Sequence, residues 1–201
     1  LARQAEAGLK YAWTPAFGLQ AALYRIRQPY QFAQPDSSEA GFTFVQHGEE
    51  VHSGLELNAA GQVGDDLRLT ASVNLIQARV RDTGTPSYER HQVVNVPKLR
   101  GNVYMDYRLP LAANLHVLAG WRYASSNPAT PDRLTRVPAY HVFDVGLRHV
   151  TRWQQHQLTW RLNIDNVFDH FYWRDTGSSL GDSYLFPGAP RLARLSLGMD
   201  F

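Results

Sequence analysis

Cysteine is absent from this chain, and lysine is scarce. The absence of cysteine excludes disulfide bonds and any chemistry that depends on a thiol. Lysine occurs only at Lys10 and Lys98, so arginine carries almost all of the positive charge. The formal net charge is only +2, and the arginines are scattered along the sequence. This pattern argues against a nucleic-acid-binding protein, in which basic residues usually form a cluster.

Long apolar runs are also missing. No stretch approaches the roughly 18 apolar residues of a membrane-spanning helix, and the mean hydropathy is −0.37. These observations exclude a helical membrane protein. They do not exclude a membrane β-barrel, because a barrel strand turns only every second residue towards lipid. Of the 201 residues 44% are hydrophobic and 12% are aromatic, which is enough apolar content for a folded protein.

The sequence is rich in segments in which apolar and polar residues alternate, the pattern of a β-strand with one apolar and one polar face. In the last segment Leu195, Leu197 and Met199 alternate with Ser196 and Gly198. Strands of roughly 10–15 residues exceed the usual globular length and suit a tilted membrane crossing. The alternation predicts nine strands, at about residues 4–13, 17–27, 49–60, 66–80, 97–108, 113–123, 140–150, 157–167 and 190–201.

The connections between these segments alternate strictly in length. The short ones are 14–16, 61–65, 110–113 and 151–156, and the long ones are 28–48, 82–96, 124–139 and 168–189. Antiparallel barrel strands with tight turns at one membrane face and extended loops at the other produce this alternation. A soluble β-sandwich, a competing interpretation, has no reason to sort its loops by end. We therefore expect an all-β, antiparallel transmembrane β-barrel segment.

Nine strands are an odd number, whereas bacterial single-chain barrels normally have an even number. Open sheet edges in lipid would also leave backbone groups without hydrogen bonds. The chain begins at Leu1 without a signal peptide. We expect the chain to be the C-terminal part of a larger barrel.

Several short motifs resemble those of TonB-dependent outer-membrane receptors. The end of the chain resembles the C-terminal signature of that family. The matching residues are the segment from Asn166 to Asp169, Tyr172, Tyr184, Gly188, Pro190, Arg191 and the terminal Phe201. Gly54 and Glu56 match its "RGxE" strand, although Ser53 stands where arginine is common. The resemblance extends over essentially the whole chain. Its most specific part is the set of C-terminal motif residues together with the alternation of short and long connections.

The resemblance implies a 22-stranded plugged barrel, of which residues 1–201 are the last nine strands, with the plug domain and earlier strands absent. It implies an active transporter in the outer membrane of a Gram-negative bacterium. The cargo is a chelated metal nutrient, best matched by a ferric siderophore and imported by TonB coupling. The implied partners are outer-membrane lipid, the plug, TonB through the plug, the ligand and the barrel assembly machinery, for which Phe201 would be the assembly signal. The alternative is a small self-contained outer-membrane barrel or porin-like channel.

The polar stripes of the strands are candidates to line the barrel lumen. In a plugged barrel these side chains would be hydrated and would hydrogen-bond to the plug. A second interpretation is that the arginines guide an anionic substrate, because guanidinium binds carboxylates in a bidentate manner. The candidates are Arg68, Asn74, Arg100, Asn102, Asp106, His116, Arg122, Asp144, Arg148, Arg161, Asn163 and Asp165.

Aromatic residues gather in the first and last long loops. Tyr30, Phe32, Phe42 and Phe44 surround the first loop, and Trp173, Arg174 and Tyr184 belong to the last. Aromatic rings beside arginine suit flat, partly apolar anions such as ferric siderophores. These seven residues are therefore candidate ligand-binding residues. The alternative is that the rings cap the barrel rim or pack one loop on another.

No motif predicts catalysis or direct metal binding. The sequence has no nucleophile elbow, phosphate-binding loop or paired-cysteine motif. His47 and His52 flank two glutamates, but their spacing is not that of a metal site. Without such motifs we do not expect an enzyme, and we expect no bound cofactor. The family resemblance implies iron that is already chelated, so no metal ligand from the protein is required.

Overall fold

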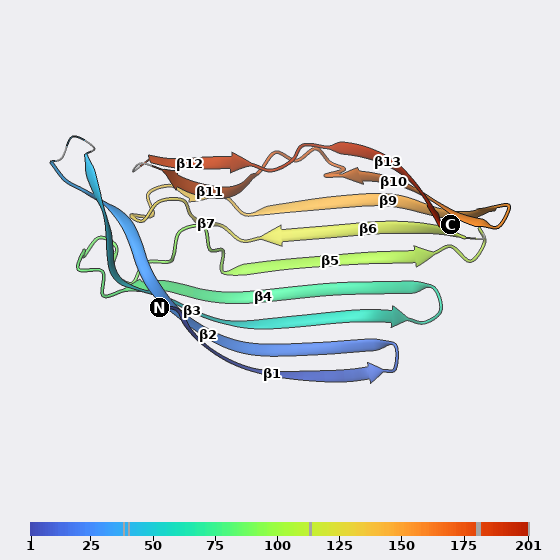
Figure 1. The fold of residues 1–201 in the computed structure, drawn as a ribbon, viewed down its shortest axis with the longest axis horizontal. Coiled ribbons are helices and arrows are strands. Elements are labelled where there is room, and N and C mark those ends of the chain that lie inside the picture. The colour runs from blue at the N-terminus through green and yellow to red at the C-terminus, as the bar shows by residue number, and fades with distance from the viewer. Residues whose placement is uncertain (38, 40, 113, 180–181, 201) are drawn as a thin grey trace.

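The computed structural model describes residues 1–37, 39, 41–112, 114–179 and 182–200. Nine antiparallel strands form one sheet, in the order β1-β2-β3-β4-β5-β6-β9-β10-β13 (Figure 1). Every neighbour in the sheet is thus the next long strand of the chain. The strands are β1 (Arg3–Thr14), β2 (Phe17–Pro35), β3 (Phe42–Val63), β4 (Leu67–Arg81), β5 (Leu99–Arg108), β6 (Leu115–Ala124), β9 (Tyr140–Trp153), β10 (His156–Asp165) and β13 (Leu192–Asp200).

The sequence prediction of nine antiparallel strands is confirmed. The sorting of the connections by length holds for all but the first long connection, since only residues 36–41 separate β2 from β3. Short turns lie at one end of the sheet and long connections at the other (Figure 1). No helix in the described part of the chain is long and apolar enough to cross a membrane.

Part of the first long connection, predicted as a loop over 28–48, is instead a continuation of β2 and β3. Pairing extends as far as Pro35 and Phe42. The register shifts between Pro29 and Gln31, where proline has no N–H to donate to the ladder. The bulge absorbs the proline, and the hairpin continues beyond it.

Two other predicted loops each contain a small hairpin. Strands β7 (Asn127–Pro128) and β8 (Arg136–Val137) pair within one, and β11 (Trp173–Ser179) and β12 (Asp182–Pro187) pair within the other. These hairpins lie at the long-loop end of the sheet (Figure 1).

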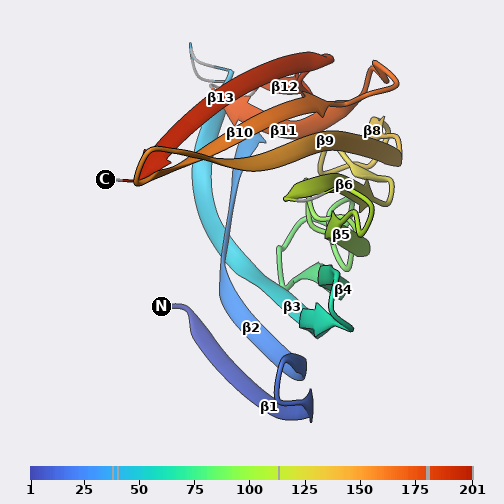
Figure 2. The same ribbon diagram turned by 90° about the vertical axis from the view of Figure 1, so that its right-hand side faces the viewer.

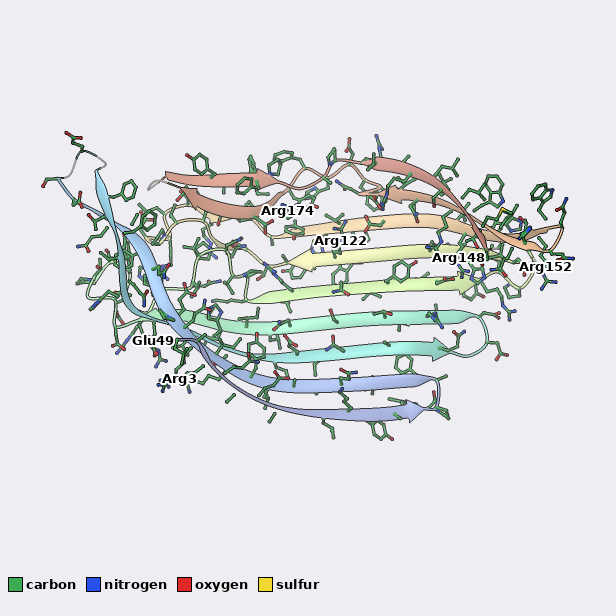
Figure 3. All side chains as sticks on the ribbon, viewed as in Figure 1. Arg3, Glu49, Arg122, Arg148, Arg152 and Arg174 are labelled. Atoms are coloured by element: carbon green, nitrogen blue, oxygen red, sulfur yellow. The ribbon has the colours of Figure 1, made fainter. Side chains whose placement is uncertain are left out.

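The sheet is curved like a section of barrel wall, and its two faces differ in polarity. Figure 2 shows the strands following an open arc, with the outer part of the β2–β3 hairpin rising across the open side. Figure 3 faces the concave side, where Arg122 and Arg148 project from β6 and β9. The alternate residues point to the convex side, because side chains alternate along every strand.

A small hydrophobic core lies at the long-loop end rather than within the sheet. Tyr30, Phe32, Ala78, Val80 and Val93 are buried together, and Val45, Ile76, Tyr88 and Val96 pack against them. The connection between β4 and β5 runs back along β4, with Val80 N donating to His91 O and Val93 N to Ala78 O. Burial of each large side chain stabilises such a cluster by about 1.5–3 kcal/mol. This cluster therefore fixes the first two long connections relative to each other.

Candidate functional site

A three-residue polar network crosses the concave face near the short turns. Asp106 of β5 accepts hydrogen bonds through its two carboxylate oxygens, from His116 Nδ1 at 2.6 Å and from Arg148 at 2.6 Å. The Arg148 guanidinium also lies 2.8 Å from His116 Nδ1. Because β6 lies between β5 and β9, the network joins three adjacent strands. All three side chains are about four-fifths buried.

A second network lies nearer the long loops. Arg122 of β6 pairs with Asp144 of β9 at 3.2 Å. Asp144 also accepts a hydrogen bond from the backbone N–H of Asn166 at 2.8 Å. The Asn166 side chain in turn bonds to the backbone of His170 and Ala189, so it ties together the segment that leads to β11 and the one that leads to β13. In the sequence Asn166 is only one residue of a motif. Its positive φ of 49° and its buried amide identify it as a structural hub.

The remaining lumen candidates lie on the same face with different degrees of pairing. Asp165 pairs with Arg194 at 2.8 Å across the β10–β13 ladder. Within the described residues, Arg68, Arg100 and Arg161 are exposed and form no ion pair or side-chain hydrogen bond. Arg68 borders a cavity of about 340 Å³ together with the Asp106 network. The concave face therefore carries both satisfied networks and arginines that remain open to a further partner.

A third polar group on the concave face connects β2, β3 and β4. Tyr24 OH donates to Asn74 Oδ1 at 3.1 Å, and Asn74 Nδ2 donates to Glu56 Oε1 at 3.0 Å. Gly54 permits this contact, because a Cβ there would lie 2.4 Å from the tyrosine oxygen and 2.6 Å from the Leu75 carbonyl oxygen. The glycine of the predicted Gly54–Glu56 motif is thus required by the ring that crosses it.

The convex face is apolar and open. Leu195 is 72% exposed and Leu197 is 54% exposed, and their partners across the ladder are Leu162 and Trp160. The polar residues between them pair instead with concave residues, as Ser196 does with Arg161. Exposed contiguous apolar surface of this kind is unusual in water and typical of a face that contacts lipid.

The aromatic candidates of the first long connection divide into two pairs. Tyr30 and Phe32 are buried, their rings stack 5.0 Å apart, and Phe32 meets Tyr88 edge-to-face at 5.4 Å. This placement favours the interpretation that they pack one loop on another. Phe42 and Phe44 form an edge-to-face pair at 5.4 Å near the end of the hairpin, and Phe44 is 63% exposed.

The candidates of the last long connection lie on the β11–β12 hairpin. Trp173 packs edge-to-face on Phe171 at 5.1 Å, and Arg174 bonds through Nε to Asp175 Oδ2 at 2.5 Å. Tyr184 of β12 is 49% exposed. The hairpin thus offers aromatic rings and a guanidinium, although Arg174 already pairs with the carboxylate of Asp175. The remaining site candidate, Phe201, lies outside the described residues.

Two carboxylates hold the other long connections in shape. Glu89 accepts hydrogen bonds from the backbone N–H groups of Asp82 and Thr83 and from the Thr83 hydroxyl, at 3.0–3.1 Å. These bonds, led by the Thr83 N–H, lower the pKa of Glu89 below its ordinary 4.5. The hydroxyl of Thr130 and the N–H of Leu134 likewise lower the pKa of Asp132.

His52 and Glu50, near the start of the predicted third strand, form polar contacts with each other and with β2. His52 lies 3.2 Å from Glu50, whose carboxylate also accepts a hydrogen bond from Gln28. Across the described ranges, no three His, Asp or Glu side chains are grouped as a metal site would require.

The curved antiparallel sheet, the apolar convex face and the polar concave face together define a section of β-barrel wall. Residues 1–167 match the family described as "TonB dependent receptor-like, beta-barrel", and the chain belongs to this family.

Relatives and solved structures agree with this assignment. The ferrichrome receptor FcuA of Yersinia enterocolitica is 27% identical over 199 residues, which cover 99% of this chain and 25% of the relative. The ferrioxamine B receptor of Salmonella typhimurium is 27% identical over 197 residues, covering 94% of this chain and 26% of the relative. The chain thus spans about a quarter of the length of these relatives.

Among solved structures, BauA, the ferric preacinetobactin receptor of Acinetobacter baumannii, superimposes with a TM-score of 0.84 at 26% identity. The match covers all of this chain and 29% of that one. The ferric citrate transporter FecA has the same fold, with a TM-score of 0.78 at 20% identity over 98% of this chain and 31% of that one.

Proposed function

We propose that this chain forms part of the wall of an outer-membrane receptor of a Gram-negative bacterium. The whole receptor imports a ferric siderophore, with energy supplied by TonB through a plug domain inside the barrel. The observation that carries the proposal is the division of the sheet into an apolar convex face and a polar concave face, in a chain of this receptor family. The names of the ferrichrome, ferrioxamine B and preacinetobactin receptors support the class of ligand.

The long-loop end is the proposed entrance. Figure 2 shows the outer part of the β2–β3 hairpin reaching across the open side of the sheet towards the level of β12. Phe44 at one side and Tyr184 at the other are exposed, and Arg174 lies beside Trp173. Exposed rings and a guanidinium provide contacts for a flat anionic chelate. The buried Tyr30 and Phe32 support the shape of the entrance instead of contacting ligand.

The concave face is the proposed surface against the plug and the passing ligand. Arg68, Arg100 and Arg161 have no ion pair within the described residues, so each can bind a carboxylate of the plug or of the chelate. The paired residues, such as Asp106 and Arg148, keep the wall rigid while the plug moves.

Growth on defined iron sources tests the proposal. The complete receptor gene is expressed in a strain without its own siderophore receptors, and iron is supplied as ferrichrome, ferrioxamine B or ferric citrate. We expect growth on at least one of these sources, and no growth when TonB is deleted. Rescue that persists without TonB would indicate a passive channel, and the absence of rescue on every siderophore offered would contradict the assigned ligand class.

A further inference from the structure

Arginines gather on the convex face at the long-loop end of β1–β4. Arg3 of β1 pairs in register with Arg27 of β2, and Val51 of β3 lies between Arg27 and Arg79 of β4. Arg25 lies one outward position closer to the apolar rows. With Arg81 these form a set of five exposed arginines, which we call the outer arginine patch: Arg3, Arg25, Arg27, Arg79 and Arg81. They are scattered in sequence, and only the register brings them together.

The patch begins where the apolar rows end. On the outward face of β4 the last apolar residue of the regular rows is Leu75, and Gln77 and Arg79 follow it. From Leu67 to Leu75 the strand rises about 26 Å, at about 3.3 Å per residue. At a tilt of about 40° this is roughly 20 Å of height, close to the apolar band of about 25 Å in such barrels. Arg79 therefore lies at the height of lipid headgroups.

Acidic residues balance only a small part of this charge. Glu49 lies 3.8 Å from Arg27 and is the one carboxylate paired with the patch among the described residues. The neighbouring Glu50 bonds on the concave side, to Gln28 and His52. Figure 3 labels Arg3 and Glu49 at this end of the sheet. The patch thus keeps about four positive charges beside the lipid-facing surface.

The patch is confined to one part of the wall. At the same end of β6 and β9 the outward residues are aromatic, with Tyr123 and His141 tilted against each other at 4.6 Å and Trp121 stacked on both. A general need for solubility would distribute charge around the whole rim. The described strands instead separate an aromatic sector from a cationic one.

A cavity at the edge of the patch carries further cations. Arg79 and Gln77 border a space of about 200 Å³ together with Gln92, Lys98 and Arg133. A hydrogen bond from Arg79 to the Arg90 carbonyl, 3.1 Å long, holds its guanidinium in place. Three cations and two amide side chains, without a carboxylate, match the donors that a phosphate group requires.

We propose that the outer arginine patch, with this cavity, binds the phosphate groups of a phosphorylated glycolipid in the outer leaflet of the membrane. The inference rests on the proposed function in one respect, since the convex face must lie in the outer membrane. Continuity of the patch with the apolar rows favours a lipid over a soluble anion, because the acyl chains of a bound lipid would cover those rows. Guanidinium groups bind phosphate in a bidentate manner, which suits arginine more than lysine.

The test compares two triple variants of the complete receptor in phosphatidylcholine nanodiscs, with diphosphorylated lipid A as the probe. One variant is Arg25→Gln, Arg27→Gln and Arg79→Gln. The control removes the same charge from the concave face, as Arg68→Gln, Arg100→Gln and Arg161→Gln. Each basic side chain near an anionic surface strengthens association about fivefold, so we expect the outward variant to bind lipid A on the order of a hundredfold more weakly. The control should bind as the parent does.

Further measurements separate the outcomes. Binding should weaken for dephosphorylated lipid A and at high salt, and the corresponding Arg→Lys variant should keep most of it with an unchanged melting temperature. Equal binding by the two Gln variants, or displacement of lipid A by low concentrations of inorganic phosphate, would overturn the proposal. Siderophore-dependent growth is measured on the same variants. If the outward Gln variant grows on siderophore iron and binds lipid A as the parent does, only the lipid site is refuted. If the parent receptor does not insert into the membrane, the proposed function is refuted as well.

Discussion

Removing the carboxylate of Asp106 should loosen three strands at once. The carboxylate joins β5 to His116 on β6 and to Arg148 on β9, through contacts of 2.6 Å. The change Asp106→Asn keeps the size of the side chain and removes its charge. It leaves the Arg148 guanidinium, which is 21% exposed, without an ionic partner. We therefore expect loss of stability without loss of the fold.

The magnitude follows from the burial of the network. Hydrogen bonds to charged groups contribute about 1.5–3 kcal/mol, and exposed ion pairs only about 0–1 kcal/mol. With side chains about four-fifths buried, the Asp106 network lies nearer the first range. We expect Asp106→Asn to lower the free energy of unfolding by about 2 kcal/mol, with a coupling of about 1–2 kcal/mol to Arg148.

A double-mutant cycle measures this coupling. The complete receptor is refolded into liposomes, and urea unfolding is followed by tryptophan fluorescence for Asp106→Asn, Arg148→Met and the double variant. The matched control is the pair Asp66–Arg108, which is 2.7 Å long against 2.6 Å for Asp106–Arg148 but has its arginine 52% exposed. Its coupling should stay below about 1 kcal/mol. A coupling at Asp106–Arg148 no larger than that of the control would refute the reasoning.

Three other predictions concern the faces and the loops. Leu195→Asp should reduce membrane assembly, since a charge on the lipid face costs roughly 2 kcal/mol. Ser196→Asp should be tolerated, because it lies beside Arg161 on the concave face. Equal yields of the two variants in an assembly assay would contradict the assignment of Leu195 to the lipid face. Trp173→Ala should raise the siderophore concentration that half-saturates uptake and leave the midpoint of urea unfolding unchanged. Normal uptake by this variant would show that Trp173 only packs against its neighbours. Because the native pKa of Glu89 is lowered, its contribution is present above about pH 4.5 and is lost as the pH falls through the native value. Amide-exchange protection of Thr83 should therefore fall on acidification, but in Glu89→Gln it should not vary with pH over that range; an unchanged pH dependence would assign the effect to another group.

The strands were predictable because each carries its own signal in the form of period-two alternation. The same alternation continues through Tyr30 and Phe32, although the sequence prediction placed a break there by ending the strand at about residue 27. The break did not occur because the partner strand accepts a bulge at Pro29, and this depends on pairing that a single segment does not reveal. The two-residue strands β7 and β8 are too short to show any periodicity.

The polar character of the concave face was also predictable, but its pairings were not. Asp106 and Arg148 are 42 residues apart in sequence, and their contact depends on the register of three strands. The outer arginine patch shows the same limit, because arginines that appear scattered in the sequence become neighbours only through strand pairing. Of the aromatic candidates, Tyr30 and Phe32 are indistinguishable from the others by residue type, and tertiary burial separates them.

The most direct test of the central claim is a solvent-accessibility scan of β13. Because the chain has no cysteine, a single substituted cysteine is the only thiol in these 201 residues. Each position from Arg194 to Met199 is labelled with a nitroxide in the membrane-embedded receptor, and its collisions with oxygen and with a water-soluble nickel complex are compared. We predict oxygen-dominated signals at Leu195, Leu197 and Met199 and nickel-dominated signals between them. A uniform response, or the opposite alternation, would contradict a wall with lipid on its convex side and water on its concave side.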